Sequence, residues 1–157
     1  MLSRIENGQY TGMEDVSVDE ILDELLPDLM DIYEHKQVRL IRKREEQPFI
    51  IRCNHSLAQI LVSNLVKNSL LHNREGGELQ VLTTPTSLVI KNTGDVPLDG
   101  EKLFRRFYHG MDGKKDSTGL GLAIARSIAL SSSLKLTYEW QDGMHTFRLV
   151  KESEIYR

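Results

Sequence analysis

The order in which helix and strand patterns follow one another limits the folds open to this chain. Two strong helix patterns, at residues 56–72 and 119–131, are each followed by a hairpin pattern, at residues 78–91 and 134–150. Helices and antiparallel hairpins therefore come in blocks, without the strict β-α-β alternation of a parallel doubly wound sheet. This order predicts an α/β two-layer sandwich, in which a mixed, mostly antiparallel sheet packs against helices.

The N-terminal part of the sequence adds weaker patterns. Residues 16–18 predict a strand, and Asp19 is expected to cap an amphipathic helix that runs to about Glu34. Apolar residues at 38–41 and 49–51 predict two further strands on either side of a charged turn.

Composition and charge exclude several classes of protein. The 157 residues are 39% hydrophobic and 27% charged, which is ordinary for one soluble globular domain. The net charge of −3 argues against nucleic-acid binding, for which a strong basic excess is usual. No apolar run approaches the length of a membrane span, and the single cysteine, Cys53, cannot form an internal disulfide. We therefore expect a cytoplasmic domain that binds no nucleic acid.

A glycine-rich turn leads into the second strong helix. Gly119 and Gly121 stand directly before its apolar residues. A helix N-terminus offers unpaired N–H groups and the positive end of a dipole, so it attracts phosphate, and glycine lets a ligand approach the backbone. The alternative is a plain helix cap at Ser117 or Thr118, with the glycines serving only the turn.

The first strong helix carries two polar stripes about 140° apart, given 3.6 residues per turn. One stripe contains Gln59, Ser63 and Lys67 and gives the helix a side that faces solvent. The other contains Asn64, Asn68 and His72, with apolar residues between them. Amides in apolar surroundings need partners, and a hydrated divalent cation that carries phosphates would satisfy their oxygens. A surface helix with two polar sides is the alternative.

The segment between the two hairpins contains two further candidates. Asn92 ends a predicted strand beside Gly94, where its amide could bind a purine edge or make an Asx-turn. Residues 103–108 mix aromatic residues with arginines, so they predict either a short core-packed helix or an anchor for the lysine-bearing residues 109–117. A segment of that kind beside a phosphate site would act as a lid.

Four of these segments, taken in order, resemble the catalytic ATP-binding domain of sensor histidine kinases of two-component systems. Residues 64–69 resemble the N box of that family, residues 92–94 its first glycine box, residues 103–108 its F box and residues 118–124 its second glycine box. The resemblance extends over about residues 16–151. It places the chain in the wider group that includes gyrase, Hsp90 and MutL, and it implies a Bergerat-type α/β sandwich with ATP between the helix layer and a lid.

The resemblance also implies a division of the chain. Residues 1–15 would be the end of a dimerisation helix plus a linker, and residues 16–157 would be the ATP-binding catalytic domain. The parent protein would be a membrane-anchored homodimer whose cytosolic portion contains this chain. Its partners would be its own dimerisation domain, which bears the phosphoacceptor, and a response regulator.

The family's functional residues carry over position by position. Asn68 would hold Mg²⁺ between the phosphates, and Asn64 would assist it or orient water, so these two are the expected catalytic residues. His72 would flank the nucleotide. Asn92 would meet the adenine amino group, and Gly94 would leave space for the ring. The other expected nucleotide-binding residues lie in the lid and the second glycine box: Arg106, Tyr108, His109, Lys114, Thr118, Gly119, Leu120, Gly121 and Leu122.

Three positions depart from the family pattern. The adenine-reading residue is usually Asp and is Asn92 here; Leu71 stands where a lysine is usual, and His109 where an arginine is common. Two cationic phosphate partners are therefore missing or weakened. The candidates to replace them are Lys114, Lys115 and Arg126.

The expected reaction is transfer of the γ-phosphoryl group of ATP to a histidine that is followed by an acidic residue. None of the five histidines of the chain has such a neighbour, so the acceptor is expected outside the chain. The alternatives are a degenerate, non-catalytic nucleotide-binding module and an anti-sigma-type serine-protein kinase of the same fold. A gyrase-like or MutL-like ATPase is disfavoured by the acidic pI and by the absence of a catalytic glutamate at Asn64.

Overall fold

One five-stranded sheet forms the front layer of the molecule. The computed structural model describes residues 4–5, 10–105 and 120–152. In order across the sheet, the strands are β2 (Arg39–Arg44), β4 (Glu78–Thr84), β5 (Ser87–Thr93), β7 (Met144–Lys151) and β6 (Leu134–Gln141). The β2–β4 pair is parallel and the other three pairs are antiparallel. The mixed, mostly antiparallel sheet predicted from the sequence is confirmed.

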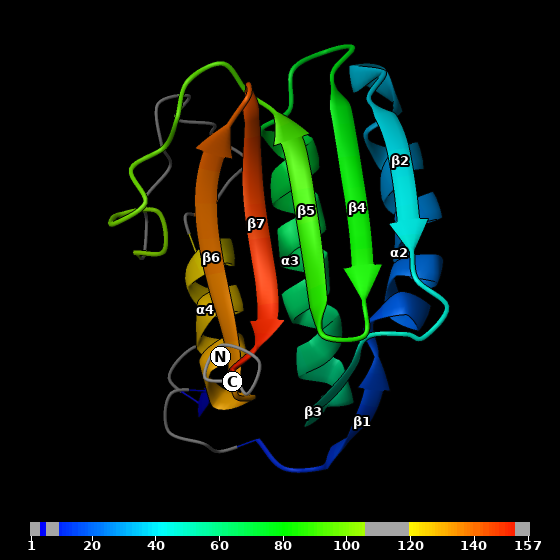
Figure 1. Ribbon diagram of the computed structural model, residues 1–157, viewed down its shortest axis with the longest axis vertical. Coiled ribbons are helices and arrows are strands. Elements are labelled where there is room, and N and C mark those ends of the chain that lie inside the picture. The colour runs from blue at the N-terminus through cyan, green and yellow to red at the C-terminus, as the bar shows by residue number, and fades with distance from the viewer. Residues whose placement is uncertain (1–3, 6–9, 106–119, 153–157) are drawn as a thin grey trace.

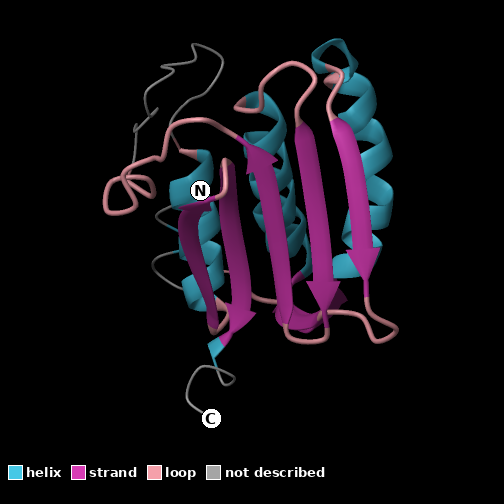
Figure 2. Cartoon of the chain, turned by 45° about the horizontal axis from the view of Figure 1, so that its top comes forward, coloured by secondary structure: helices cyan, strands magenta, loops and turns pink. Residues whose placement is uncertain are grey.

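Three helices cover one face of this sheet. They are α2 (Val18–Ile32), α3 (His55–Leu71) and α4 (Gly121–Ser131), and Figures 1 and 2 show all three on the same side. A short 3₁₀ helix, η1 (Glu34–Lys36), follows α2. Alternation along the strands directs one row of side chains at the helices, so that Val81, Ile90 and Phe147 are almost fully buried. The two-layer sandwich is therefore also confirmed.

A second, two-stranded sheet lies beside the first, built from β1 (Met13–Ser17) and β3 (Ile50–Asn54) in antiparallel pairing. The strands expected at 38–41 and 49–51 both exist, as β2 and β3, but they do not form a hairpin with each other. The chain between them is fixed to the start of α2, because the Val18 N–H donates to the Phe49 carbonyl at 2.9 Å. Phe49 itself is fully buried.

The start of α2 differs from the sequence-based prediction. Ser17 caps the helix, since its Oγ accepts the Glu20 N–H at 3.2 Å. Asp19 lies in the first turn and is only 5% exposed. Its carboxylate accepts hydrogen bonds from Thr83 Oγ1 at 2.6 Å, from the Phe49 N–H at 2.8 Å and from Arg42 Nη2 at 2.9 Å.

Burial by itself would raise the pKa of the Asp19 carboxyl. The hydrogen bonds from Thr83, the Phe49 N–H and Arg42, with the charge of Arg42, outweigh burial and hold this pKa below its ordinary value. Asp19 is therefore a buried, ionised tie between α2, β2, β4 and the start of β3, and it is not a helix cap.

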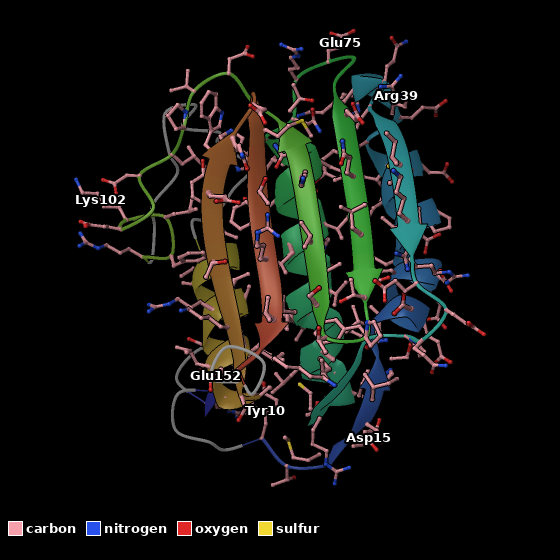
Figure 3. All side chains as sticks on the ribbon, viewed as in Figure 1. Tyr10, Asp15, Arg39, Glu75, Lys102 and Glu152 are labelled. Atoms are coloured by element: carbon pink, nitrogen blue, oxygen red, sulfur yellow. The ribbon has the colours of Figure 1, made fainter. Side chains whose placement is uncertain are left out.

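The two ends of the main sheet differ in what they bring together. At the upper end in Figure 1 lie the C-terminal end of α3, the end of β5 and the β6–β7 turn, whereas α4 begins lower down, beside the middle of α3. Glu75 and Arg39 mark this end in Figure 3, and Asp15 marks the opposite end.

β2 is an edge strand and four of its six residues are basic: Arg39, Arg42, Lys43 and Arg44.

No helix within the described ranges is long and apolar enough to span a bilayer.

Candidate functional site

The asparagine stripe of α3 faces the start of α4. Asn64, Asn68 and His72 are all half-buried. A Cβ atom added to Gly121 would stand 3.8 Å from Asn64 Oδ1, so the first residue of α4 lies directly beside this amide. Across the described part of the chain, the side chains of Asn64 and Asn68 have no hydrogen-bond partner. The amide of Asn64 is thus held next to a helix N-terminus, and among the described residues the fold uses neither this amide nor that of Asn68.

The N-terminus of α4 has no side-chain cap from its N-cap residue. The helix begins at Gly121, and the N-cap is Leu120, whose aliphatic side chain cannot accept a hydrogen bond. Ser117 and Thr118, the alternative caps, lie outside the described residues. The N–H groups of Gly121 and Leu122 belong to the first turn, where the helix dipole is positive. This geometry suits an anion.

Asn68 and His72 extend the stripe beyond the start of α4. Each step of four residues along an α-helix advances about 6 Å, so Asn68 lies one turn, and His72 two turns, closer to the upper end than Asn64 does. The C-terminal end of α3 lies at that upper end, and α4 begins below it, beside the middle of α3 (Figure 1). A ligand bound at the start of α4 would therefore run along Asn64 and Asn68 toward His72.

Asn92 presents a buried hydrogen-bond acceptor at the end of β5. Alternation places it on the same face as Leu88 and Ile90, toward the helices, and it is 1% exposed. Its Nδ2 donates to the Thr93 carbonyl at 3.3 Å, whereas its Oδ1 has no hydrogen-bond partner in the described structure. An Asx-turn would use that oxygen to accept a backbone N–H, so the Asx-turn alternative is wrong. A buried oxygen without a donor is costly unless a ligand supplies one.

Gly94 does not have open space beside it. A Cβ added there would lie 2.1 Å from Nε2 of His145, a distance no side chain tolerates. The expectation was that Gly94 leaves room for an adenine ring. In the structure, an imidazole occupies the space beside its Cα.

His145 is a residue of this region that the sequence-based prediction missed. It is 7% exposed and is the cross-strand partner of Asn92. A signal was available in the sequence, because His145 has the same strand parity as Phe147 and Leu149. That parity places a polar ring on the face of β7 that points at the helices.

Several predicted residues fall outside the described ranges or play a different part. The described beginning of the F box behaves as a core anchor, with Leu103 buried and Phe104 edge-on to Phe147 at 6.4 Å between ring centroids. Arg126 lines a separate groove, of about 860 Å³, together with Phe104 and Tyr138. The expected site residues outside the described ranges are Arg106, Tyr108, His109, Lys114, Lys115, Thr118 and Gly119.

Leu71, where the family has a lysine, is bonded to a cation through its backbone. The ammonium of Lys36, in η1, donates to the Leu71 carbonyl and to the Asn73 carbonyl, the latter at 3.0 Å. This cation therefore caps the C-terminal end of α3, where carbonyl groups and the negative dipole end need one.

The chain is similar to known proteins in sequence and in fold. Residues 53–153 match the family described as histidine kinase-, DNA gyrase B- and HSP90-like ATPases. The chain is 28% identical over 151 residues to the sensor histidine kinase RppB of Synechocystis, an alignment that covers 88% of this chain and 33% of RppB. The chain thus spans about a third of the length of this relative.

Solved structures share the fold. The nucleotide-free catalytic domain of the histidine kinase ThkA superposes with a TM-score of 0.78 at 18% identity, over 90% of this chain and 97% of that domain. ThkA in complex with the response regulator protein TrrA superposes with a TM-score of 0.71 at 17% identity, over 92% of this chain and 43% of that chain. The resemblance to sensor histidine kinases that the four boxes indicated is confirmed. Because the family match covers more than half of the sequence, the chain belongs to the histidine kinase-, DNA gyrase B- and HSP90-like ATPases.

Proposed function

We propose that this chain is the ATP-binding catalytic part of a sensor histidine kinase, with the nucleotide lying between α3, α4 and the end of β5. One observation supports this most directly: the start of α4, without a side-chain cap from Leu120, lies beside the Asn64 amide, which has no hydrogen-bond partner among the described residues. The buried acceptor of Asn92, near the end of β5, supports the adenine side. The two features suit the two chemically different ends of one ATP molecule.

The residues present fit Mg²⁺-ATP. Asn92 Oδ1 would accept a hydrogen bond from the adenine amino group, and the first-turn N–H groups of α4 would donate to phosphate oxygens. Asn68 would contribute an amide oxygen to Mg²⁺, with Asn64 beside it. Within the described ranges, no group of three or more His, Cys, Asp or Glu side chains could hold a metal ion. The ion would therefore be shared between an amide, the phosphates and water, as is usual for Mg²⁺.

The reaction proposed is transfer of the γ-phosphoryl group to a histidine on a dimerisation domain outside this chain. Residues 1–15 would be the end of that domain plus a linker. The parent would be a membrane-anchored homodimer that passes the phosphoryl group to a response regulator, the class of partner seen with ThkA. The contribution of this chain to the reaction would be positioning and charge stabilisation.

A calorimetric titration with ATP, with and without Mg²⁺, tests the nucleotide site. We expect saturable binding with a Kd well below about 1 mM, tightened by Mg²⁺. In Asn68→Ala the effect of Mg²⁺ should disappear while metal-free binding persists, whereas Lys67→Ala, an exposed neighbour on the other stripe, should behave as wild type. The absence of saturable binding below millimolar ATP in the wild-type chain would refute the proposal.

A degenerate, non-catalytic module is the second candidate, because Asn92 and Leu71 depart from the family pattern. Joining the parent dimerisation segment to this chain and adding γ-labelled ATP separates the two. Acid-labile phosphohistidine supports the kinase. Tight ATP binding without any label supports the degenerate module.

A further inference from the structure

We propose that His145 is a positioning residue for adenine recognition, acting together with Tyr138 on the segment that follows Asn92. This inference rests on the proposed function and concerns how the adenine side of that site is held in shape. Neither residue belongs to the four sequence boxes.

His145 lies in β7, directly opposite Asn92 of β5. It is paired across the strands with Asn92, so both side chains stand on the same, helix-facing side of the sheet. Its imidazole is buried and abuts the Cα of Gly94, where a Cβ would come within 2.1 Å of Nε2. The ring therefore fixes how closely the backbone after Asn92 approaches β7.

Tyr138, in β6, contacts both the imidazole of His145 and the segment that follows Gly94. Its hydroxyl is hydrogen-bonded to His145 Nδ1 at 2.7 Å, and the two rings stack with centroids 5.8 Å apart. The backbone N–H of Leu98 donates to the same hydroxyl at 2.9 Å. A single hydroxyl thus connects β6, the β7 imidazole and the backbone four residues beyond Gly94.

The near end of this segment is fixed by the same hairpin. The Gly94 N–H donates to the Gly143 carbonyl at 3.0 Å, and Trp140 Nε1 donates to the Gly94 carbonyl at 2.7 Å. The β6–β7 hairpin therefore holds the segment between Gly94 and Leu98 at both of its ends.

These contacts should affect recognition of the adenine ring and should not affect binding of the phosphates. Hydrogen bonds weaken steeply with misalignment, so a shift of the backbone after Asn92 would turn Oδ1 away from the adenine amino group. The N-terminus of α4 takes no part in the Tyr138–His145 contact. Loosening this contact should therefore reduce affinity for ATP and leave affinity for a nucleotide without that amino group almost unchanged.

The test is Tyr138→Phe, which removes one hydroxyl and keeps the ring. We expect the Kd for ATP to rise about five- to tenfold, as for the loss of one net hydrogen bond. The Kd for GTP, which has a carbonyl where ATP has its amino group, should stay within about twofold, so the preference for ATP falls. The matched control is Tyr10→Phe, because the Tyr10 hydroxyl has no hydrogen-bond partner in the described structure.

A second pair of variants tests the contact with Gly94. Gly94→Ala should weaken ATP binding strongly, and adding His145→Ser should return it to the level of His145→Ser alone. If the double variant stays as weak as Gly94→Ala, the glycine is needed by the nucleotide and the proposal is overturned. An unchanged ATP-over-GTP preference in Tyr138→Phe also overturns it. Both results presuppose a wild-type chain that binds ATP; a wild-type chain that binds none refutes the proposed function instead.

Discussion

The two ends of the main sheet treat buried polar groups in opposite ways. At the lower end, the Asp19 carboxylate receives three hydrogen bonds, from Thr83, Phe49 and Arg42. At the upper end, the Asn92 amide oxygen receives none in the described structure. Strand β4 connects the two ends, because it contains both Thr83 and Leu79, the pairing partner of Asn92.

The difference separates polar groups that serve the fold from polar groups kept for a ligand. A buried charge with all its partners stabilises the fold, and removing one partner leaves the other charged group without a counter-ion. A missing partner alone does not identify a site, since Asn73 Oδ1 and Arg42 Nε also lack one. The Asn73 oxygen is closed off by Gly77, where a Cβ would come within 2.2 Å of it. What distinguishes Asn92 is its place on the helix-facing side of the sheet, in a molecule where α4 begins without a side-chain cap from its N-cap residue Leu120.

Asp19→Ala should give the largest effect, on stability. Removing the carboxylate leaves the half-buried Arg42 guanidinium without its counter-ion, so we expect a loss of roughly 3–5 kcal/mol in the free energy of unfolding. Denaturant melts would measure it. Asp23→Ala is the matched control, because its pair with Arg44 is about half exposed on both sides and should contribute less than about 1 kcal/mol. Equal losses of unfolding free energy in the two variants would show that the Asp19 contacts stabilise the fold no more than an exposed ion pair does.

Asn92→Leu should affect binding and not stability. The variant removes an acceptor that has no donor in the described structure, together with one long hydrogen bond from Nδ2 to the Thr93 carbonyl, so the unfolding free energy should change by less than about 1 kcal/mol. The Kd for ATP should rise about tenfold or more, as for a lost hydrogen bond to the adenine. Calorimetry and a denaturant melt on the same sample decide it. A large loss of stability with unchanged affinity would show that Asn92 belongs to the fold, like Asp19.

The pH dependence of stability sharpens the account of the lower end. The folded-state pKa of Asp19 is lowered, so its contribution is complete above the unfolded-state pKa of about 4 and is lost as the pH falls through the lower, folded-state value. The stability gap between wild type and Asp19→Asn should therefore be constant from pH 7 to about pH 5 and narrow at more acidic pH. A gap that persists unchanged into strong acid would contradict an ionised Asp19.

Gly121→Ala should give the smallest effect. Its Cβ would make an ordinary contact, 3.8 Å from Asn64 Oδ1, and alanine favours a helix over glycine by about 0.5–1 kcal/mol. We expect equal or slightly higher stability and an ATP affinity several-fold lower, because the methyl group would stand where the phosphates approach the backbone. Unchanged affinity would remove Gly121 from the site.

The sequence predicted the elements with local periodicity and missed the contacts made over long separations. The helix at 56–72 and both hairpins follow from patterns within a few residues, and α3, β4–β5 and β6–β7 confirm them. The pairing of β1 with β3 depends on residues nearly forty positions apart, which no local pattern encodes. An acidic residue at a helix start is typical of a cap, and only the position of Arg42 in space shows that Asp19 is a buried tie.

The site follows the same rule. The Asn64–Asn68 stripe and the glycine turn could be found from spacing, and their meeting at Gly121 agrees with that prediction. Local spacing could not show why a glycine is needed at position 94, because the cause is a contact with the imidazole of His145, 51 positions further along the chain. The roles of Arg106, Tyr108, His109 and Lys114 stay predictions.

The composition of β2 has a consequence for self-association. As an edge strand, β2 has backbone N–H and C=O groups along one side to which another strand could add. Its long charged side chains, several of them tied to carboxylates of α2 and β4, would have to lose water and partners before a second copy could pair there. We therefore expect this edge to resist sheet extension, so that the isolated domain remains dispersed at the concentrations that nucleotide titrations require.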